Sequence, residues 1–170
     1  EKDVIFCPGA SDRGFVVKEI IMDQKIICLS VGLSQKEIEK GKALYFAASE
    51  GQSTLEVTAM SRSMLNMKII EILACLMEEL EKNPAEKQND SADVIPADHC
   101  KAAVLVMLAQ DRELVLQVMR SFKAVLSDSR NVIFAVITET ALKWTLAEYL
   151  EHLSREHEYM QTSRPENNPD

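Results

Sequence analysis

Six polar side chains lie where strand-like runs of the sequence end, which is the edge where ligands bind in open α/β sheets. Hydroxyl groups beside helix N-termini can hold an anion, because free backbone N–H groups point outward there. The candidate ligand-binding residues are Ser34, Ser61, Ser63, Asp111, Thr138 and Thr140. They predict a site for an anion or a nucleotide, or an enzymatic site, if strand order brings the turns together.

The histidines and cysteines form no metal-binding pattern. His152 and His157 are five residues apart, so they do not share a helix face and do not form H-E-x-x-H. His99 and Cys100 could bind a metal together with Cys7 or His157, but no ligand spacing supports such a site. No nucleophile and base can be paired either. We therefore expect no metal site, no cofactor and no catalytic residue.

A strand followed by a capped helix is predicted near the C-terminal end. Residues 132–137 are six consecutive apolar residues, mostly β-branched, which is typical of a strand buried on both faces. Thr145 and Glu148 have the spacing of a capping box, in which each side chain binds the other residue's backbone N–H. Trp144 and Tyr149 have the spacing of a hydrophobic staple, which explains the tryptophan without a stacked ligand.

The first half of the chain repeats these signals. Ser34 and Glu37 form a second capping box, and Gly41 lies inside the helix that follows, where a close approach of helix and sheet would explain it. Residues 67–80 are apolar nearly all round, so this helix should pack on more than one side or meet a partner. Cys75 within it is expected to be buried as a small apolar residue.

These elements predict an α/β fold with two βαβα repeats sharing one mostly parallel or mixed sheet, with helices packed on it. An offset of 77 residues places Leu73 on Leu150 and Leu76 on Leu153, and an offset of 76 fits the earlier strands. The predicted divisions are an N-terminal extension 1–25, a first βαβα unit 26–82, a linker 83–101, a second βαβα unit 102–160 and a disordered tail 161–170.

Composition excludes several classes of function. The net charge of −8 disfavours nucleic-acid binding, which needs clustered basic residues, and it disfavours docking on anionic membranes. No apolar run approaches the length of a membrane-spanning helix, and no signal peptide is recognisable at the start. The four cysteines are scattered, without a C-x-x-C pair. A reducing cytoplasm is therefore the expected location.

The C-terminal part resembles a small bacterial family that is catalogued only as a domain of unknown function. The resemblance rests on residues 134–140 (FAVITET), on Trp144 and Thr145, on Leu150 and on residues 155–158 (REHE). Residues from 26 to about 38 resemble the family's N-terminal half, so the resemblance spans about 26–159. It implies a two-unit α/β fold, and it brings no established activity.

Two departures from the family pattern bear on any ligand site. The family usually has Pro and Asn in its turn, where this chain has Glu139 and Ala141. It usually has a Gly-Phe pair after the second-unit strand, where this chain has Ala109 and Gln110. A site built from those residues would be lost here.

Two hypotheses follow. The favoured one is an uncharacterised cytoplasmic bacterial domain, non-catalytic, that acts through contact with a protein partner or with itself, for example as a homodimer. Its basis is the apolar helix 67–80, the acidic surface and the missing catalytic pattern. The alternative is anion or nucleotide binding, or catalysis, at the six turn residues.

Overall fold

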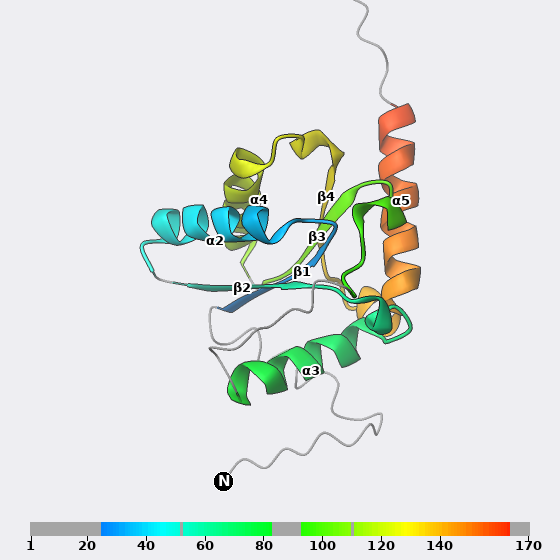
Figure 1. Cartoon of the computed structure of the whole chain (residues 1–170), viewed down its shortest axis with the longest axis horizontal. Coiled ribbons are helices and arrows are strands. Elements are labelled where there is room, and N and C mark those ends of the chain that lie inside the picture. Colours follow the sequence, from blue (N-terminus) through cyan, green and yellow to red (C-terminus); the bar gives the residue numbers. More distant parts are fainter. Residues whose placement is uncertain (1–24, 52, 83–92, 110, 164–170) are drawn as a thin grey trace, which may run out of the picture.

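The computed structural model describes residues 25–51, 53–82, 93–109 and 111–163. Nearly all of the predicted N-terminal extension, residues 83–92 of the predicted linker and residues 164–170 of the predicted tail lie outside the described residues. Each half of the described chain reads strand, helix, strand, helix (Figure 1). The predicted α/β fold with two βαβα units is thus confirmed.

The first unit is built from two strands and two helices, with a short 3-10 turn before the second helix. They are β1 (Lys25–Val31), α2 (Gln35–Ser49), β2 (Thr54–Ala59) and α3 (Ile69–Lys82). The second unit has the same order of strands and helices, with a 3-10 turn before its second strand and another before its second helix: β3 (Ala103–Leu108), α4 (Arg112–Val125), β4 (Val132–Val136) and α5 (Leu146–Thr162).

The four strands form one mixed sheet in the order β2-β1-β3-β4. The two strands within each unit are parallel, and the units meet where β1 and β3 run antiparallel. The central strands are the most apolar, and both are buried along nearly their whole length. This arrangement leaves β2 and β4 as the outer strands of the described sheet.

The parallel strands of the two units pair in the same register. Ile26 pairs with Leu55 in the first unit, and 77 residues later Ala103 pairs with Val132 in the second. Leu29 pairs across the middle with Val106, its own equivalent at that offset. The offset of 76 for the early strands stays a prediction, because paired residues are 29 positions apart in both units and the register therefore fits either offset.

A second contact of the same kind joins the segments that lead into α3 and α5. Lys68 forms an antiparallel bridge with Thr145, again 77 residues apart. Ile69 donates its backbone N–H to the carbonyl of Trp144 at 2.9 Å, and Leu146 donates to the carbonyl of Met67 at 2.9 Å. These two hydrogen bonds are equivalent under exchange of the units, so a local two-fold axis passes between them.

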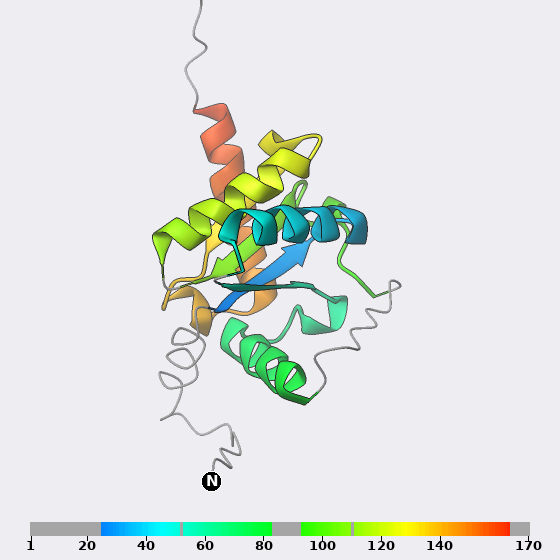
Figure 2. The same cartoon turned by 90° about the vertical axis from the view of Figure 1, so that its left-hand side faces the viewer.

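Helices cover both faces of the sheet. The helices α2 and α4 lie side by side on one face, and α3 and α5 lie on the other (Figures 1 and 2). Each face buries a separate apolar cluster: Tyr45 and Phe122 belong to the first, and Ile72, Leu73 and Leu150 to the second. The units thus complete one another's core on both sides.

Gly41 is explained by a neighbouring helix and not by the sheet. A Cβ atom at Gly41 would lie 2.5 Å from Cε1 of Phe122, a buried residue of α4. The predicted close approach of helix and sheet is therefore corrected to a close approach of α2 and α4. Only the missing side chain lets the Phe122 ring occupy this place between the helices.

The prediction that residues 132–137 are buried on both faces is wrong. Ile133 and Ile137 are buried, but Val132, Phe134 and Ala135 are half-buried and Val136 is exposed. The physical reason is position: β4 pairs only with β3 among the described strands, so its outer side meets no further strand. An apolar run fits a central strand or an edge strand that is covered by helices.

The described part of the predicted linker contributes to the core. Ile95 is fully buried and donates its backbone N–H to the carbonyl of Met60 at 2.9 Å. Val94 forms an antiparallel bridge with Ser61. Residues 93–101 therefore pack against the end of the first unit before the chain enters β3.

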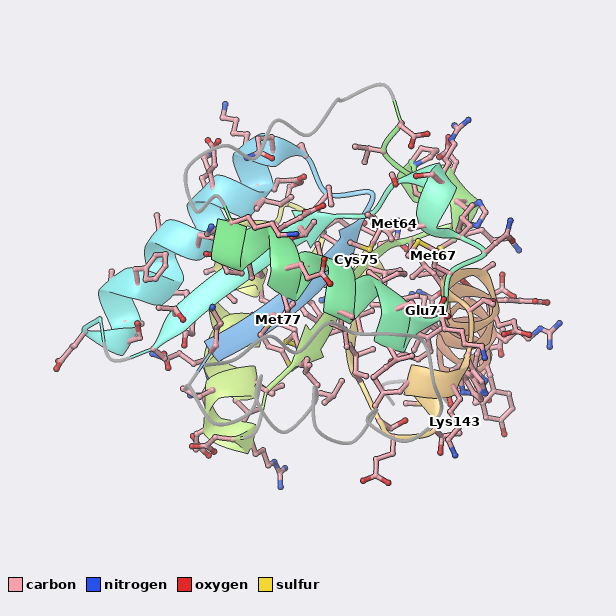
Figure 3. The ribbon with its side chains drawn as sticks, turned by 90° about the horizontal axis from the view of Figure 1, so that it is seen from below. Met64, Met67, Glu71, Cys75, Met77 and Lys143 are labelled. Carbon is pink, nitrogen blue, oxygen red and sulfur yellow. The ribbon has the colours of Figure 1, made fainter. Side chains whose placement is uncertain are left out.

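Cys75 is exposed, although the apolar surroundings in the sequence predicted burial. Figure 3 views α3 from its outer side, with Glu71 and Cys75 labelled on this helix. The buried stripe of α3 runs through Ile69, Ile72, Leu73 and Leu76. Cys75 falls outside that stripe, because helical geometry turns it about 100° away from each sequence neighbour.

Candidate functional site

The six predicted ligand-binding residues divide between opposite ends of the sheet. Because β1 and β3 are antiparallel, the strand ends of the first unit point one way and those of the second unit the other. Three of the six follow strands of the first unit: Ser34, Ser61 and Ser63. The other three follow strands of the second unit: Asp111, Thr138 and Thr140. They therefore do not meet in one pocket.

Two of these residues cap helices. The Ser34 hydroxyl accepts a hydrogen bond from the Glu37 backbone N–H, and the Glu37 carboxylate accepts one from the Ser34 backbone N–H, so the predicted capping box is confirmed. The Asp111 carboxylate accepts a hydrogen bond from the Glu113 backbone N–H at 2.9 Å at the start of α4. Both side chains occupy the helix N-termini at which an anion would bind.

The remaining four are also largely engaged. The hydroxyl groups of Ser61 and Ser63 lie 2.7 Å apart and share a hydrogen bond. The Thr138 hydroxyl accepts the backbone N–H of Ala141 at 3.2 Å. Thr140 is exposed and makes no side-chain capping bond. Ligand binding by these residues stays a prediction, but each engaged group would have to exchange an internal bond for the ligand.

A small pocket beyond the end of β1 does not suit an anion. Its volume is about 240 Å³, and Gly32 and Leu33 lie on its wall, whereas Ser34 does not. The charged residues lining it are three acids and one base, Glu37, Asp98, Asp128 and Lys101. The negative excess would repel a phosphate or carboxylate.

A large hollow runs between β4 and α5. It is an open groove of about 1020 Å³ at the outer side of the sheet. We call it the β4–α5 groove. All of β4 lines it, together with Lys123, Arg130, Thr138, Trp144, Tyr149, His152, Leu153, Glu156, His157, Met160 and some of their neighbours.

The floor of the β4–α5 groove is the unpaired side of a strand. Ile137 donates its backbone N–H to the carbonyl of Met107 in β3 at 2.9 Å. In a parallel pair, alternate residues direct both backbone groups to the same neighbour. The N–H and C=O groups of Phe134 and Val136 therefore point away from β3, and no described strand receives them.

One of these outward groups is held by α5. The Tyr149 hydroxyl donates a hydrogen bond to the Val136 carbonyl at 3.2 Å. Burial, and secondly the charge of Glu156, raise the pKa of Tyr149 to about 12, so the hydroxyl stays protonated at neutral pH and remains a donor. The N–H of Val136 and both backbone groups of Phe134 are left facing the groove.

The α5 wall is aromatic and is fixed by the capping box. The Thr145 hydroxyl accepts the Glu148 backbone N–H at 3.2 Å, and the Glu148 carboxylate accepts the Thr145 backbone N–H at 2.9 Å, so this predicted box is confirmed. Trp144 packs on Tyr149 with ring centroids 6.2 Å apart, as the staple spacing predicts. Trp144 also meets the ring of His152 edge-on at 5.0 Å.

The opposite wall is basic. Lys123 extends from α4, and its Nζ lies 5.4 Å from the centroid of the Phe134 ring, a cation–π distance. Arg130 comes from the short turn that leads into β4. Both side chains are exposed, and both line the groove. Two fixed positive charges thus flank the start and middle of the open strand edge.

The groove's histidines are bound to partners on their own helix. His152 Nε2 lies 3.2 Å from a Glu156 carboxylate oxygen, and His157 Nε2 lies 2.8 Å from the Gln161 side-chain nitrogen. Among the described residues, no three His, Cys, Asp or Glu side chains gather where they could hold a metal ion. The arrangement offers contact chemistry: open backbone groups, aromatic surface and positive charge.

Among the groove residues, only Thr138 was predicted to bind a ligand. Trp144 was predicted to be a helix staple, and the sequence did not indicate a site role for Lys123, Arg130 or Val136. The outer position of β4 among the described strands follows from the strand order, which no local pattern in the sequence fixes.

The match to known families covers the second unit. Residues 103–160 match the family model "Domain of unknown function (DUF3783)". The resemblance of the C-terminal part to a family of unknown function is thereby confirmed over residues 103–160, which hold most of the groove lining, whereas Gln161 and Ser163 lie beyond the match. Comparison with curated proteins and with solved structures gave no significant match. In the described part of the chain, no helix is long and apolar enough to cross a lipid bilayer.

Proposed function

We propose that this chain is a non-catalytic binding domain that acts by contact with another protein chain, through the β4–α5 groove. The observation that carries the proposal is the open edge of β4. Outward backbone groups of Phe134 and Val136 meet no described strand, and the Val136 side chain is 43% exposed. An uncovered strand edge is a ready template for pairing with a further chain.

The chemistry of the groove supports contact more than catalysis. His152 is held between Trp144 and Glu156, and the Tyr149 hydroxyl is committed to the Val136 carbonyl. Groups fixed in this way can shape a binding surface, whereas a general base needs a free lone pair aimed at a substrate. A cytoplasmic location remains our expectation, supported by unpaired cysteines at the three described positions.

Photo-cross-linking tests the proposal in the organism that makes the protein. A photoreactive amino acid at Val136 should give covalent adducts of discrete mass with another protein. The same residue at Leu44 is the matched control, because Leu44 is an equally exposed apolar residue (42%) on α2, outside the groove. Absence of adducts at Val136, or equal adducts at both positions, would contradict the proposal.

The alternative function has its own test. A thermal-shift screen with nucleotides and metabolites should give no stabilisation that depends on the turn residues. A ligand whose stabilising effect disappears in the double variant Ser61→Ala with Thr138→Ala would favour ligand binding instead. The double variant tests the predicted residues of both units at once, because Ser61 and Thr138 lie at opposite ends of the sheet.

A further inference from the structure

We infer that the partner of the β4–α5 groove is an extended segment with alternating acidic and apolar side chains, which adds to the sheet as a strand beside β4. This inference rests on the proposed function and names the class of partner. It follows from three features of the groove: the direction of the backbone groups, the difference between its two walls, and its charge.

The backbone groups of β4 set the conformation of the partner. The N–H and C=O of Phe134 and the N–H of Val136 point away from β3 and are spaced as in a strand. An extended peptide can satisfy all of them by strand addition, in which main-chain hydrogen bonds supply affinity without regard to sequence. A helix or a compact loop could not meet groups at this spacing.

The two walls of the groove set the order of side chains. Successive side chains of a strand point to opposite faces of the sheet. On one face an added strand would meet the half-buried Trp144 and the exposed Met160 of the α5 wall, which are aromatic and apolar. On the other it would meet Lys123 and Arg130. Apolar residues must therefore alternate with residues that complement positive charge.

The charge of the groove favours acidic residues and disfavours a second copy of this chain. The chain carries a net charge of −8, yet two full positive charges, Lys123 and Arg130, gather at this edge. The described acid of the groove, Glu156, lies on the α5 wall, where its carboxylate is 3.2 Å from His152 Nε2. Symmetric pairing of two β4 edges would place the same basic wall of each copy at one interface, which repulsion opposes.

The inference is tested on the full chain with labelled peptides and fluorescence anisotropy. The probe is a peptide of about six residues, the usual length of a strand, in which valine and glutamate alternate. An isomer with all valines before all glutamates is the control for composition. We expect the alternating peptide to bind at least about tenfold more tightly, since only it can present one type of side chain to each wall.

Two matched charge variants locate the binding. The double variant Lys123→Glu with Arg130→Glu should weaken binding of the alternating peptide by about tenfold. Each exposed ion pair with the peptide contributes little to the binding free energy, but reversing both charges also makes the groove repel the glutamates of the peptide. The control is the double variant Lys36→Glu with Lys40→Glu, which changes the net charge by the same amount at exposed positions of α2. This control should leave binding of the peptide nearly unchanged. Hydrogen exchange should show the Phe134 and Val136 amides protected by the bound peptide.

Several outcomes would overturn the inference. Equal binding of a valine–lysine peptide or of the block isomer would do so, and so would loss of binding in both charge variants. Concentration-dependent dimers in light scattering, with the same two amides protected, would identify a second copy as the occupant. If no peptide binds while cross-links still form at Val136, the inference falls and the proposed contact function stands.

Discussion

Cys75 shows how a single position on a helix face sets chemical reactivity. Partial desolvation by neighbouring atoms, followed by the charges of Glu78, Glu79 and Glu71, raises the pKa of its thiol above the usual value, although the residue is exposed. The thiol is therefore accessible but mostly protonated at neutral pH, and the thiolate is the reactive form. Cys28 and Cys100 are buried, and burial raises the pKa of each.

We expect Cys75 to be the described cysteine that alkylates in the native protein, and to react more slowly than a free thiol. Glu78→Gln with Glu79→Gln should lower the pKa of Cys75 and speed the reaction at neutral pH. Mass spectrometry after timed iodoacetamide treatment measures the rate of alkylation at each cysteine. The experiment uses a Cys7→Ser background, because Cys7 lies outside the described residues and would complicate the comparison. Alkylation of Cys28 before Cys75 would contradict the exposed placement of Cys75.

Gly41→Ala should destabilise the fold, against the usual trend for helices. Alanine normally stabilises a helix interior by about 1 kcal/mol relative to glycine. Here its Cβ would overlap the buried Phe122 ring, and overpacking costs about 1–3 kcal/mol. Urea unfolding should therefore show a lower midpoint for Gly41→Ala.

The control for this prediction is the neighbour that causes the overlap. In a Phe122→Leu background, which removes the ring, Gly41→Ala should cost less than it does in the parent chain. Equal costs in the two backgrounds would mean that the ring is not the obstacle, since contacting residues are expected to couple.

At the scale of elements, the start of α5 depends on its capping box. Thr145→Ala removes the hydroxyl that accepts the Glu148 backbone N–H, and loss of such a cap costs about 1 kcal/mol. Thr140→Ala is the matched control, because Thr140 makes no side-chain capping bond and is exposed. Thermal unfolding should separate the two variants, and a neutral Thr145→Ala would contradict the role of the cap.

The same box predicts a dependence of stability on pH. Hydrogen bonds from the backbone and hydroxyl of Thr145 lower the pKa of Glu148 below its usual 4.5. A carboxylate with a lowered folded-state pKa stabilises the fold above its unfolded pKa, and that stabilisation is lost as the pH falls through the folded value. Glu148→Gln should therefore lose less stability than the parent chain on acidification below pH 4.5.

Urea midpoints measured across the acidic range test this, with Glu139→Gln as the control, since Glu139 is an exposed glutamate in the preceding turn. If Glu139→Gln flattened the curve as much as Glu148→Gln, the capping carboxylate would not be the source of the effect.

At the scale of the whole molecule, each unit supplies what the other lacks. The inner edge of β3 is covered only by β1, and Val106 pairs with Leu29, its equivalent in the first unit. The buried faces of α4 and α5 likewise share their clusters with α2 and α3. One unit alone would expose a strand edge and parts of two apolar clusters.

We therefore expect residues 93–163, produced alone, to associate. Two copies could pair their β3 strands in antiparallel fashion about Val106, as β3 pairs with β1 in the full chain. Analytical ultracentrifugation should show that this fragment forms a dimer, which dissociates and unfolds on dilution. The full chain serves as the folded control. A folded monomer of this fragment at micromolar concentration would show that the units do not depend on one another.

Local signals in the sequence were sufficient for the elements. Both capping boxes, the cap at Asp111 and the Trp144–Tyr149 staple lie within a few residues of the helix that they start, so spacing alone predicts them. The α/β class and the two-unit organisation follow from the same signals. Burial of single residues was predicted less well, as Cys75 shows, because it depends on which helix side meets the sheet.

The sequence by itself determined which segments become strands and helices and where the helices begin, because backbone preference and capping act over a few residues. Only the tertiary structure decided that β1 and β3 meet antiparallel. That pairing joins residues far apart in the chain, and their apolar side chains fit either direction and any order. It separates the six turn residues, and the strand order makes β4 an outer strand of the described sheet, with Lys123 beside Phe134 at the rim of the groove.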